Sequence, residues 1–460
     1  MRTPARKGDA TVGRHTGDRE LGRRARVARQ DAARMVPPAQ PGSRAAFARS
    51  LQRANGNHAA SRLLQRAVGF EFETGWQVTK KGKPPPKYTK LKQGAGWHME
   101  TDEASAKISD LEFVVYPPAE ESATGRAQLV AAMTSLENFV QALDNQKGHA
   151  QLSGAPALTP FVDQPTGVVI KPGGDITGQP QATIGLRLDR VDQLISAFRQ
   201  AGTDAQQELL GNETAWNSAT LGRAQQWATN ATDPNRAHYV PSANMRGLLA
   251  LIYQYLDRGG MPGGGATPYA KALKYTKAMT TVMARTNFAG LFRLVDDAEK
   301  DYYITHPAEW VNFVLSSMGG LGANVNVIER GMRAPKKKVV QIPITREHWL
   351  TGMLAGVDLL TAEALKQWMP KQPKVESGEV ISGAFGRLGH KTDDVGQLQA
   401  IRGAILELRD IKQGLAFEDW GVFATDVFDW IMALNAWDPT AGAGVPVYTK
   451  NAAPARGIRN

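Results

Sequence analysis

Strict alternation of apolar and polar side chains marks four short segments of the chain as strands. In the third of them, Ala182, Ile184 and Leu186 fall on one face while Thr183 and Gly185 fall on the other, as expected for a half-buried strand. The four predicted strands are residues 68–74, 109–116, 181–188 and 403–410.

Longer stretches repeat their apolar residues every three to four positions, which predicts helices. In the last of these stretches, Trp420, Phe423, Val427 and Trp430 recur at that spacing. We therefore expect these side chains to pack in the core and not to bind a ligand. The predicted helices are residues 190–200, 243–257, 287–299, 306–317 and 418–436. Because strands and helices do not alternate regularly, the pattern favours an α+β fold over a doubly wound parallel sheet.

The remaining segments predict loops, and the chain as a whole divides into a leader, a main domain and a tail. Loops are expected at the Lys/Pro-rich 80–92, the Gly-rich 258–265, 334–338 and 370–396. Residues 1–66 are rich in Arg, Ala, Gly and Pro, and we expect a disordered leader with two short helices near its end. The main domain is predicted over 67–440, and 441–460 reads as a C-terminal tail.

Composition narrows the class of protein. With 460 residues and 42% hydrophobic content, the chain can bury a large core. The sequence contains no cysteine, which excludes disulfides, thiolate metal sites and every cysteine-nucleophile mechanism. No apolar run is long enough for a membrane span or a signal-peptide core, so we expect no membrane span and no general secretory export.

The formal charge of +11 is typical of a nucleic-acid-binding protein, but all of it belongs to residues 1–66. The rest of the chain is close to neutral, so nucleic-acid binding by the main domain has little electrostatic support. Binding of a polyanion through the leader is a separate hypothesis, and it confines that activity to a tail.

Acidic residues are concentrated on the polar faces of two predicted strands. In residues 69–73, Glu71 and Glu73 point to one side and two phenylalanines to the other, while Glu112 points away from its apolar neighbours. Neighbouring carboxylates repel unless a cation lies between them, and oxygen ligands suit Mg²⁺ or Mn²⁺. A solvated acidic face is the simpler interpretation of each strand taken alone.

Two other segments carry polar groups of the same kind. Glu100 and Asp102 alternate in 97–102, and Glu407 and Arg409 share one face of the last predicted strand. A carboxylate beside a guanidinium can place a cation site next to a phosphate site, because arginine binds phosphate oxygens in a bidentate manner. An ordinary ion pair gives the same sequence pattern.

Familiar catalytic motifs are absent from the sequence, including the GxxxxGK[ST] phosphate loop, the GxSxG elbow, HExxH and the Rossmann glycine pattern. The eight histidines have no metal-ligand spacing. His98 lies closest to the acidic residues and is a candidate base, with a hydrogen-bonded structural histidine as the alternative.

The order of these segments along the chain resembles that of the amidoligases. The order is GxExE, then ExD followed by LEFVVYPP, then an alternating polar strand, and last an ExR strand. That family of carboxylate–amine ligases has the catalytic fold of glutamine synthetase and glutamate–cysteine ligase, a curved and mainly antiparallel sheet with helices packed on it. The resemblance implies ATP and Mg²⁺ or Mn²⁺ as cofactors. It also implies metal ligands at Glu71, Glu73, Glu100, Glu112 and Glu407.

The resemblance further implies that Arg409 holds a transferring phosphoryl group, with Arg285 as a second cation and Gln181, Thr183 and Arg187 lining the nucleotide site. A surface charge on a helix is the alternative for Arg285. Where the family has a histidine-containing strand, this chain has Gln181 and Thr183. A catalytically inactive ligase-like domain that binds a host partner is therefore the alternative function.

Near the end of the leader, LQRANGNHAASRLLQ resembles leader segments of proteins associated with bacterial contractile injection systems. This resemblance implies a loading or export tag in residues 1–66, and a toxin or effector that is cytoplasmic in the producing cell and exported by a non-classical route. A basic tail without a partner is the alternative interpretation.

Overall fold

The computed structural model describes ten stretches of the chain, all of which belong to one unit, Ser61–Asn460. They are residues 67–104, 108–199, 222, 224–229, 240–259, 282–317, 322–333, 338–360, 403–409 and 414–448. Two predicted segments lie outside these stretches, the leader over 1–66 and the loop over 370–396. Most residues of the loops predicted at 258–265 and 334–338 also lie outside them.

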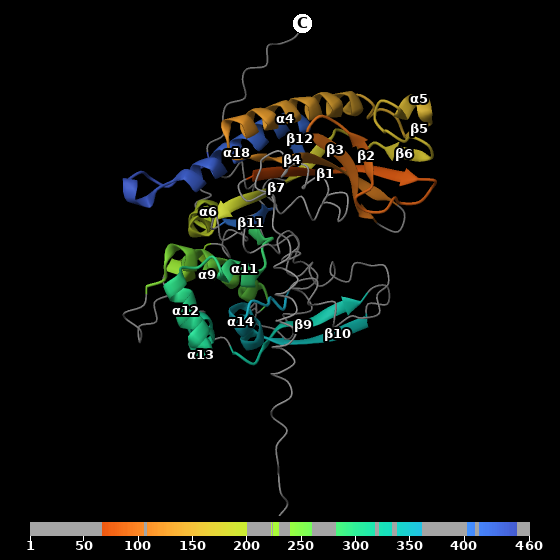
Figure 1. Ribbon diagram of the computed structural model, residues 1–460. Coiled ribbons are helices and arrows are strands. Elements are labelled where there is room, and N and C mark those ends of the chain that lie inside the picture. The colour runs from red at the N-terminus through yellow and green to blue at the C-terminus, as the bar shows by residue number, and fades with distance from the viewer. Residues whose placement is uncertain are drawn as a thin grey trace, which may run out of the picture. The chain divides into compact units, whose positions relative to one another are not determined.

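The largest sheet of the described structure is antiparallel (Figure 1), with the strand order β2-β3-β4-β1-β7-β11-β8. Each pair of neighbours in this order is antiparallel. The bounds are β1 Ala67–Lys80, β2 Lys90–Gln93, β3 Trp97–Ala104, β4 Ser109–Glu120, β7 Thr177–Arg187, β8 Val282–Ala284 and β11 Gly403–Leu408. The predicted mixed α+β fold, with its four alternating strands, is confirmed.

Shorter strands extend the sheet at its margins. β6 (Val168–Lys171) pairs with the far end of β1, β5 (Leu152–Ser153) pairs with β6, and β12 (Leu415–Ala416) pairs with β7. A separate hairpin consists of β9 (Asn326–Arg333) and β10 (Lys338–Thr345).

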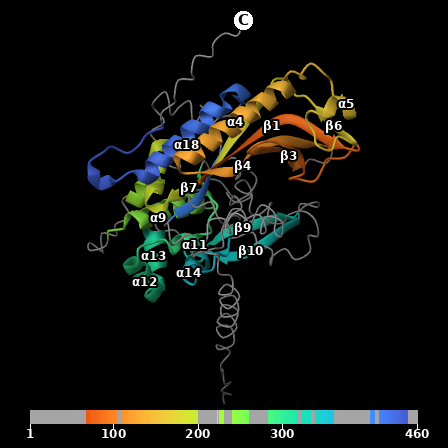
Figure 2. The same ribbon diagram turned by 45° about the horizontal axis from the view of Figure 1, so that its top comes forward.

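Two long helices, α4 (Ala123–Asp144) and α18 (Trp420–Ala436), cover one face of the sheet and lie side by side on it (Figure 2). Phe72 of β1 stacks on Trp420 with ring centroids 4.3 Å apart. Phe139 of α4 packs against Trp97, with centroids 4.7 Å apart. The phenylalanines of β1 therefore face the helices, which directs its glutamates to the opposite face.

The helix α18 was predicted from its apolar periodicity, whereas α4 was not. The signal for α4 is present in the sequence, because its buried residues recur at helical spacing and Ser122 caps the helix by accepting a hydrogen bond from the backbone N–H of Gly125, at 3.0 Å. The buried apolar residues of α4 are Leu129, Ala132, Met133, Leu136, Val140 and Leu143.

Other described helices pack mainly against one another and extend the apolar core. They are α6 Val191–Arg199, α9 Ala243–Gly259, α11 Phe288–Phe292, α12 Asp297–Thr305, α13 Pro307–Ser317 and α14 Arg346–Leu354, with the short α5 Ala155–Leu158 near β5. The single helix predicted over 287–299 is wrong: the chain forms α11 and α12 instead. Backbone hydrogen bonds from Leu294 to Leu291 and from Val295 to Phe292 tighten the chain after α11, and a new helix begins at Asp297.

Part of the predicted tail packs on the domain. The indole N–H of Trp430 in α18 donates a hydrogen bond to the carbonyl oxygen of Pro446, at 3.1 Å. Tyr448 is buried against the same tryptophan. Among the described residues, no helix combines the length and apolar character that crossing a bilayer requires.

Gly247 in α9 lies where the helix touches the preceding chain. A Cβ atom at this position would come within 2.0 Å of the carbonyl oxygen of Leu188. We expect Gly247→Ala to lower the free energy of unfolding by about 1–3 kcal/mol, because the backbone must shift. Urea denaturation would measure the change.

Gly148 provides the matched control for that substitution, because a Cβ atom there meets nothing within 4 Å. Gly148→Ala should leave the free energy of unfolding unchanged or raise it slightly. Equal effects of the two substitutions would contradict the packing of α9 described here.

Candidate acidic and cationic site

The polar face of the sheet gathers acidic side chains from three adjacent strands. Glu71 and Glu73 come from β1, Glu112 from β4, and Glu100 and Asp102 from β3. Glu112 is the common neighbour, because it lies opposite Glu73 on one side and opposite Glu100 on the other. The structure thus brings four of the five predicted metal ligands to adjacent strands of the sheet, and their role as ligands stays a prediction.

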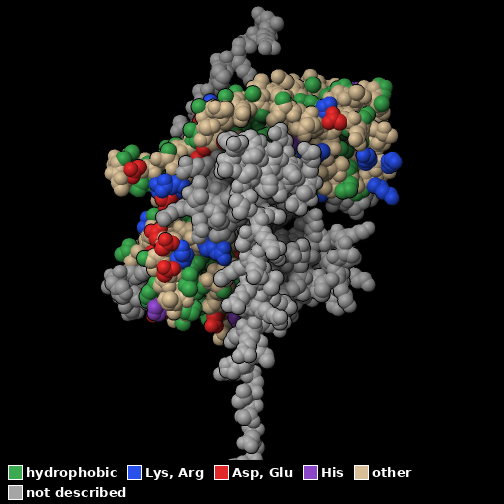
Figure 3. Space-filling view, viewed as in Figure 1, with side chains coloured by type: hydrophobic (Ala, Val, Ile, Leu, Met, Phe, Trp, Pro, Cys, Tyr) green, Lys and Arg blue, Asp and Glu red, His purple; other side chains and the backbone are tan. Residues whose placement is uncertain are grey.

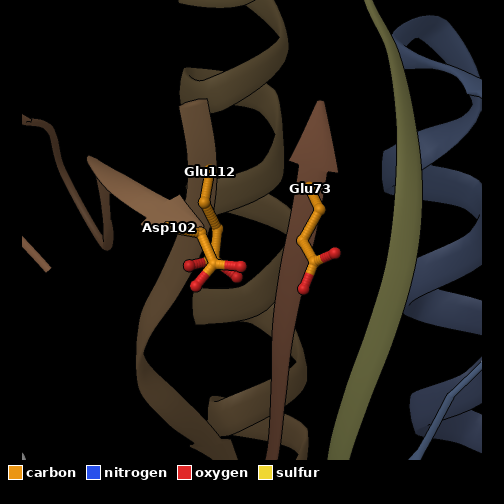
Figure 4. A group of neighbouring side chains, drawn as sticks. All are labelled: Glu73, Asp102 and Glu112. Atoms are coloured by element: carbon orange, nitrogen blue, oxygen red, sulfur yellow. The ribbon is translucent and has the colours of Figure 1, made fainter. Parts of the chain in front are cut away.

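Three of these carboxylates converge most closely (Figure 4). Each of Glu73, Asp102 and Glu112 contributes an oxygen, and the three oxygens lie within 4.8 Å of one another. Asp102 was noted in the ExD segment but was not predicted as a ligand. Only the pairing of β3 with β4 reveals its position.

Burial and mutual repulsion make this cluster electrostatically strained. The pKa of Glu112 lies well above its usual range, first because the carboxyl is buried and then because Glu71, Asp102, Glu73 and Glu100 surround it. Burial also raises the pKa of Glu73 to about 7, with a further contribution from Asp102. A bound cation would relieve both effects, because it favours the ionised carboxylates.

Glu100 is held by the histidine that the sequence offered as a base. His98 Nε2 lies 3.0 Å from Glu100 Oε2, and both side chains are buried, at 1% and 3% exposure. The ring of His98 also lies edge-on to Tyr116. This geometry fits a histidine that orients a carboxylate.

The strand β7 lies between β1, which carries acidic residues, and β11, which is followed by Arg409. The amide nitrogen of Gln181 donates a hydrogen bond to Glu73, and Thr183 lies opposite Glu407 in the strand register. Arg187 is not brought to this site, because its guanidinium pairs with Asp189 at 2.7 Å and it lies about 13 Å further along the strand from Thr183.

Beyond β7, the carboxylate of Glu407 is enclosed by two guanidinium groups. Arg285 binds its Oε2 atom and Arg409 binds its Oε1 atom. Glu407 is fully buried and Arg285 is only 5% exposed. The prediction of Glu407 as a metal ligand does not fit this arrangement, since both of its oxygens already accept hydrogen bonds from arginine.

Arg285 follows β8 and donates its backbone N–H to Ile405 of β11, at 2.8 Å. The alternative of a helix-surface charge is therefore wrong. Burial disfavours the charge on Arg409, but the nearby Glu407, Glu73 and Glu71 outweigh it and raise the pKa of the guanidinium. Arg409 thus links the ion-paired group to the acidic cluster electrostatically.

Comparison with known proteins gives little further information. No family model matches the chain, and no curated protein matches it. A solved structure titled "Structure and functional characterization of a Vibrio cholerae toxin from the MARTX/VgrG family" is similar at 10% identity and a TM-score of 0.30, covering 76% of this chain and 94% of that chain. At these values the match assigns neither a family nor an activity.

The raised pKa of Glu73 predicts a pH dependence of stability. Its carboxyl has an ordinary pKa of 4.5 and a pKa of about 7 in the folded protein, so the folded state binds the extra proton in this window. The wild-type free energy of unfolding should therefore fall, relative to Glu73→Gln, as the pH rises from 4.5 to 7, by on the order of 2 kcal/mol. Above pH 7 the difference should be constant.

Urea denaturation of both proteins at half-unit pH intervals, without added divalent ions, would measure this difference. The other titrating groups are common to the two proteins, so their contributions cancel, except for that of Glu112, whose pKa is raised in part by Glu73. A difference that does not vary with pH would contradict the buried position of Glu73.

Proposed function

We propose that this chain is an ATP- and divalent-metal-dependent ligase that joins an amine to a carboxylate, with a sheet of the glutamine-synthetase-like type. The observation that carries the proposal is the placement of five acidic side chains beside a buried Arg–Glu–Arg group on one polar face. Phosphoryl transfer needs a cation site next to a guanidinium site, because charge builds up on the phosphate oxygens.

The acidic cluster suits a hard divalent cation such as Mg²⁺ or Mn²⁺. Glu73, Asp102 and Glu112 offer oxygens close enough to share one ion, and the raised pKa of two of them indicates charge that lacks compensation. Glu71 and Glu100 adjoin this trio. A bound ion would neutralise phosphate oxygens of the nucleotide and the substrate.

The arginine group suits the transferring phosphoryl group. Glu407 fixes both guanidinium planes, so that Arg409, which is partly exposed, can turn its remaining N–H groups toward phosphate oxygens. Arg285 is deeper and supports this orientation. In this proposal, Gln181 and Thr183, which lie between the two halves, contact the nucleotide.

In the proposed reaction, an oxygen of the substrate carboxylate attacks the γ-phosphorus of ATP, and the bond to the bridging oxygen of ADP breaks. The amine nitrogen then attacks the acyl carbon, phosphate leaves, and the amine proton passes to solvent. His98 contributes by orienting Glu100, because its Nε2 atom faces that carboxylate. In this proposal, the site aligns the two substrates.

One observation favours a second candidate, an inactive ligase-like effector that binds a host partner. Gln181 stands where the amidoligase resemblance implies a histidine, and its amide occupies an oxygen of Glu73. Calorimetry with ATP and Mg²⁺ or Mn²⁺ separates the two candidates, because an inactive domain of this kind would show no nucleotide binding. In either case, delivery by an injection particle through residues 1–66 remains a proposal that rests on the leader motif.

ATP turnover is the direct test of the ligase proposal. The full chain is incubated with ATP, Mg²⁺ or Mn²⁺, and a pool of amino acids and acceptor proteins, and ADP release and new amide bonds are measured. Metal-dependent ADP release that increases with one component of the pool supports the proposal and identifies that substrate. Absence of both turnover and nucleotide binding would move the assignment to the inactive domain.

A further inference from the structure

Lys87, in the Lys/Pro-rich segment between β1 and β2, places its ammonium group against the acidic cluster. Lys87 Nζ forms an ion pair with Asp102 Oδ1, and the two side chains are only 17% and 9% exposed. Other lysines of this part of the chain, among them Lys81, Lys83 and Lys90, are exposed. Figure 3 shows Lys and Arg side chains gathered over the end of the sheet where β2 and β6 lie.

The backbone around Lys87 is fixed to the strands that carry the carboxylates. Tyr88 donates its N–H to the carbonyl oxygen of Thr101, at 2.6 Å. The Thr101 hydroxyl donates to Pro86 O at 2.7 Å, and the Ser109 hydroxyl donates to Pro85 O at 3.0 Å. Because Thr101 and Ser109 are fully buried, the ammonium group is held at Asp102 by ordered structure on both sides.

We propose that Lys87 is a built-in cation of the acidic cluster, which competes with divalent metal ions for Asp102 and so limits how tightly the cluster binds them. The inference rests on the proposed function only in assigning divalent-ion binding to this cluster. Lysine suits such a role because its charge is compact and its stem is flexible enough to reach a carboxylate oxygen.

Two physical effects act in the same direction. The ammonium group occupies an oxygen of Asp102 that a metal ion could otherwise use, and its charge repels a divalent ion held by Glu73 and Glu112. Both effects operate where burial weakens screening by water, so they are larger than at the protein surface. Removing the charge while keeping the bulk of the side chain should therefore strengthen metal binding.

The test is Mn²⁺ binding to the full chain, measured by calorimetry and by electron paramagnetic resonance of free Mn²⁺. We expect Lys87→Met to bind Mn²⁺ about tenfold or more tightly than wild type. Lys87→Arg keeps the charge and should resemble wild type. Lys171→Met, at an exposed lysine of β6, is the matched control and should leave the affinity unchanged.

The double variant Lys87→Met/Asp102→Asn, compared with Asp102→Asn alone, shows how much of the gain depends on the ion pair, and the gain in that background should be smaller. Thermal unfolding of each variant establishes that it is folded. The inference is overturned if Lys87→Met and Lys171→Met have the same Mn²⁺ affinity, if the gain is undiminished in the Asp102→Asn background, or if no variant binds Mn²⁺.

These outcomes are separate from those of the ligase proposal. A gain in Mn²⁺ affinity that depends on Asp102, in a protein that does not turn over ATP, would establish the role of Lys87 and reject the ligase. Metal-dependent ATP turnover without any effect of Lys87→Met on Mn²⁺ affinity would support the ligase and reject the role of Lys87.

Discussion

Glu73→Gln is expected to lower metal-dependent ATP turnover by at least about a hundredfold, while the protein stays folded. The substitution removes one carboxylate from the trio that includes Asp102 and Glu112. Charge stabilisation by a bound metal ion contributes several kcal/mol to a phosphoryl-transfer transition state, and each 1.4 kcal/mol is a factor of about ten in rate. Loss of a ligand should therefore reduce the rate by at least two powers of ten.

The fold should tolerate this change, because glutamine has nearly the same shape as glutamate. Its carbonyl oxygen can still accept the hydrogen bond that Gln181 donates to Glu73. The neutral amide also removes part of the repulsion that raises the pKa of Glu112. Thermal unfolding of the variant should give a midpoint at or above that of wild type at neutral pH.

Glu347→Gln is the matched control, because Glu347 is exposed on α14. It makes the same chemical change outside the acidic face and should leave ATP turnover unchanged. ADP release would be measured for both variants under saturating Mn²⁺ and ATP. Undiminished turnover in Glu73→Gln would reject the acidic cluster as the metal site.

Glu407→Ala should be among the most destabilising single substitutions on the polar face. It removes the carboxylate that binds both Arg285 and Arg409 and leaves two guanidinium groups close together in a buried place. Breaking a buried ion pair by removing one partner lowers the free energy of unfolding by about 3–5 kcal/mol. Urea denaturation would measure the loss.

Asp429→Ala provides the comparison, because Asp429 accepts two hydrogen bonds of 2.7 Å from Arg126 across α4 and α18. These side chains are 36% and 43% exposed. Solvent-exposed pairs contribute between zero and about 1 kcal/mol, so the substitution should have a small effect. Similar losses in Glu407→Ala and Asp429→Ala would show that the Arg–Glu–Arg group is more hydrated than described.

The strands and the acidic face were predictable because both depend on local alternation. A period of two places Glu71 and Glu73 on one side of a strand whatever the strand pairs with, and the structure confirms this. The opposite burial of Phe70 and Phe72 against α18 follows from the same pattern.

Features that depend on pairing between distant segments were not predictable in this way. Asp102 reaches the trio only through the pairing of β3 with β4, and Lys87 reaches Asp102 only because Thr101 and Ser109 fix its segment. The burial of Arg285 depends on β8 pairing with β11, which lies more than a hundred residues later in the chain. The sequence left open whether Arg285 is a second cation of the site or a charge on a helix surface.

The distribution of the two halves of the site along the chain also bears on the order in which they form. The acidic half lies on β1, β3 and β4, where contacts such as Thr74 to Leu111 span 37 residues. The cationic half requires β8 to meet β11, and its Arg285–Glu407 contact spans 122 residues. Since loop closure becomes less favourable with length and non-local pairing is slow, we expect a refolding chain to acquire metal affinity before it acquires affinity for phosphate.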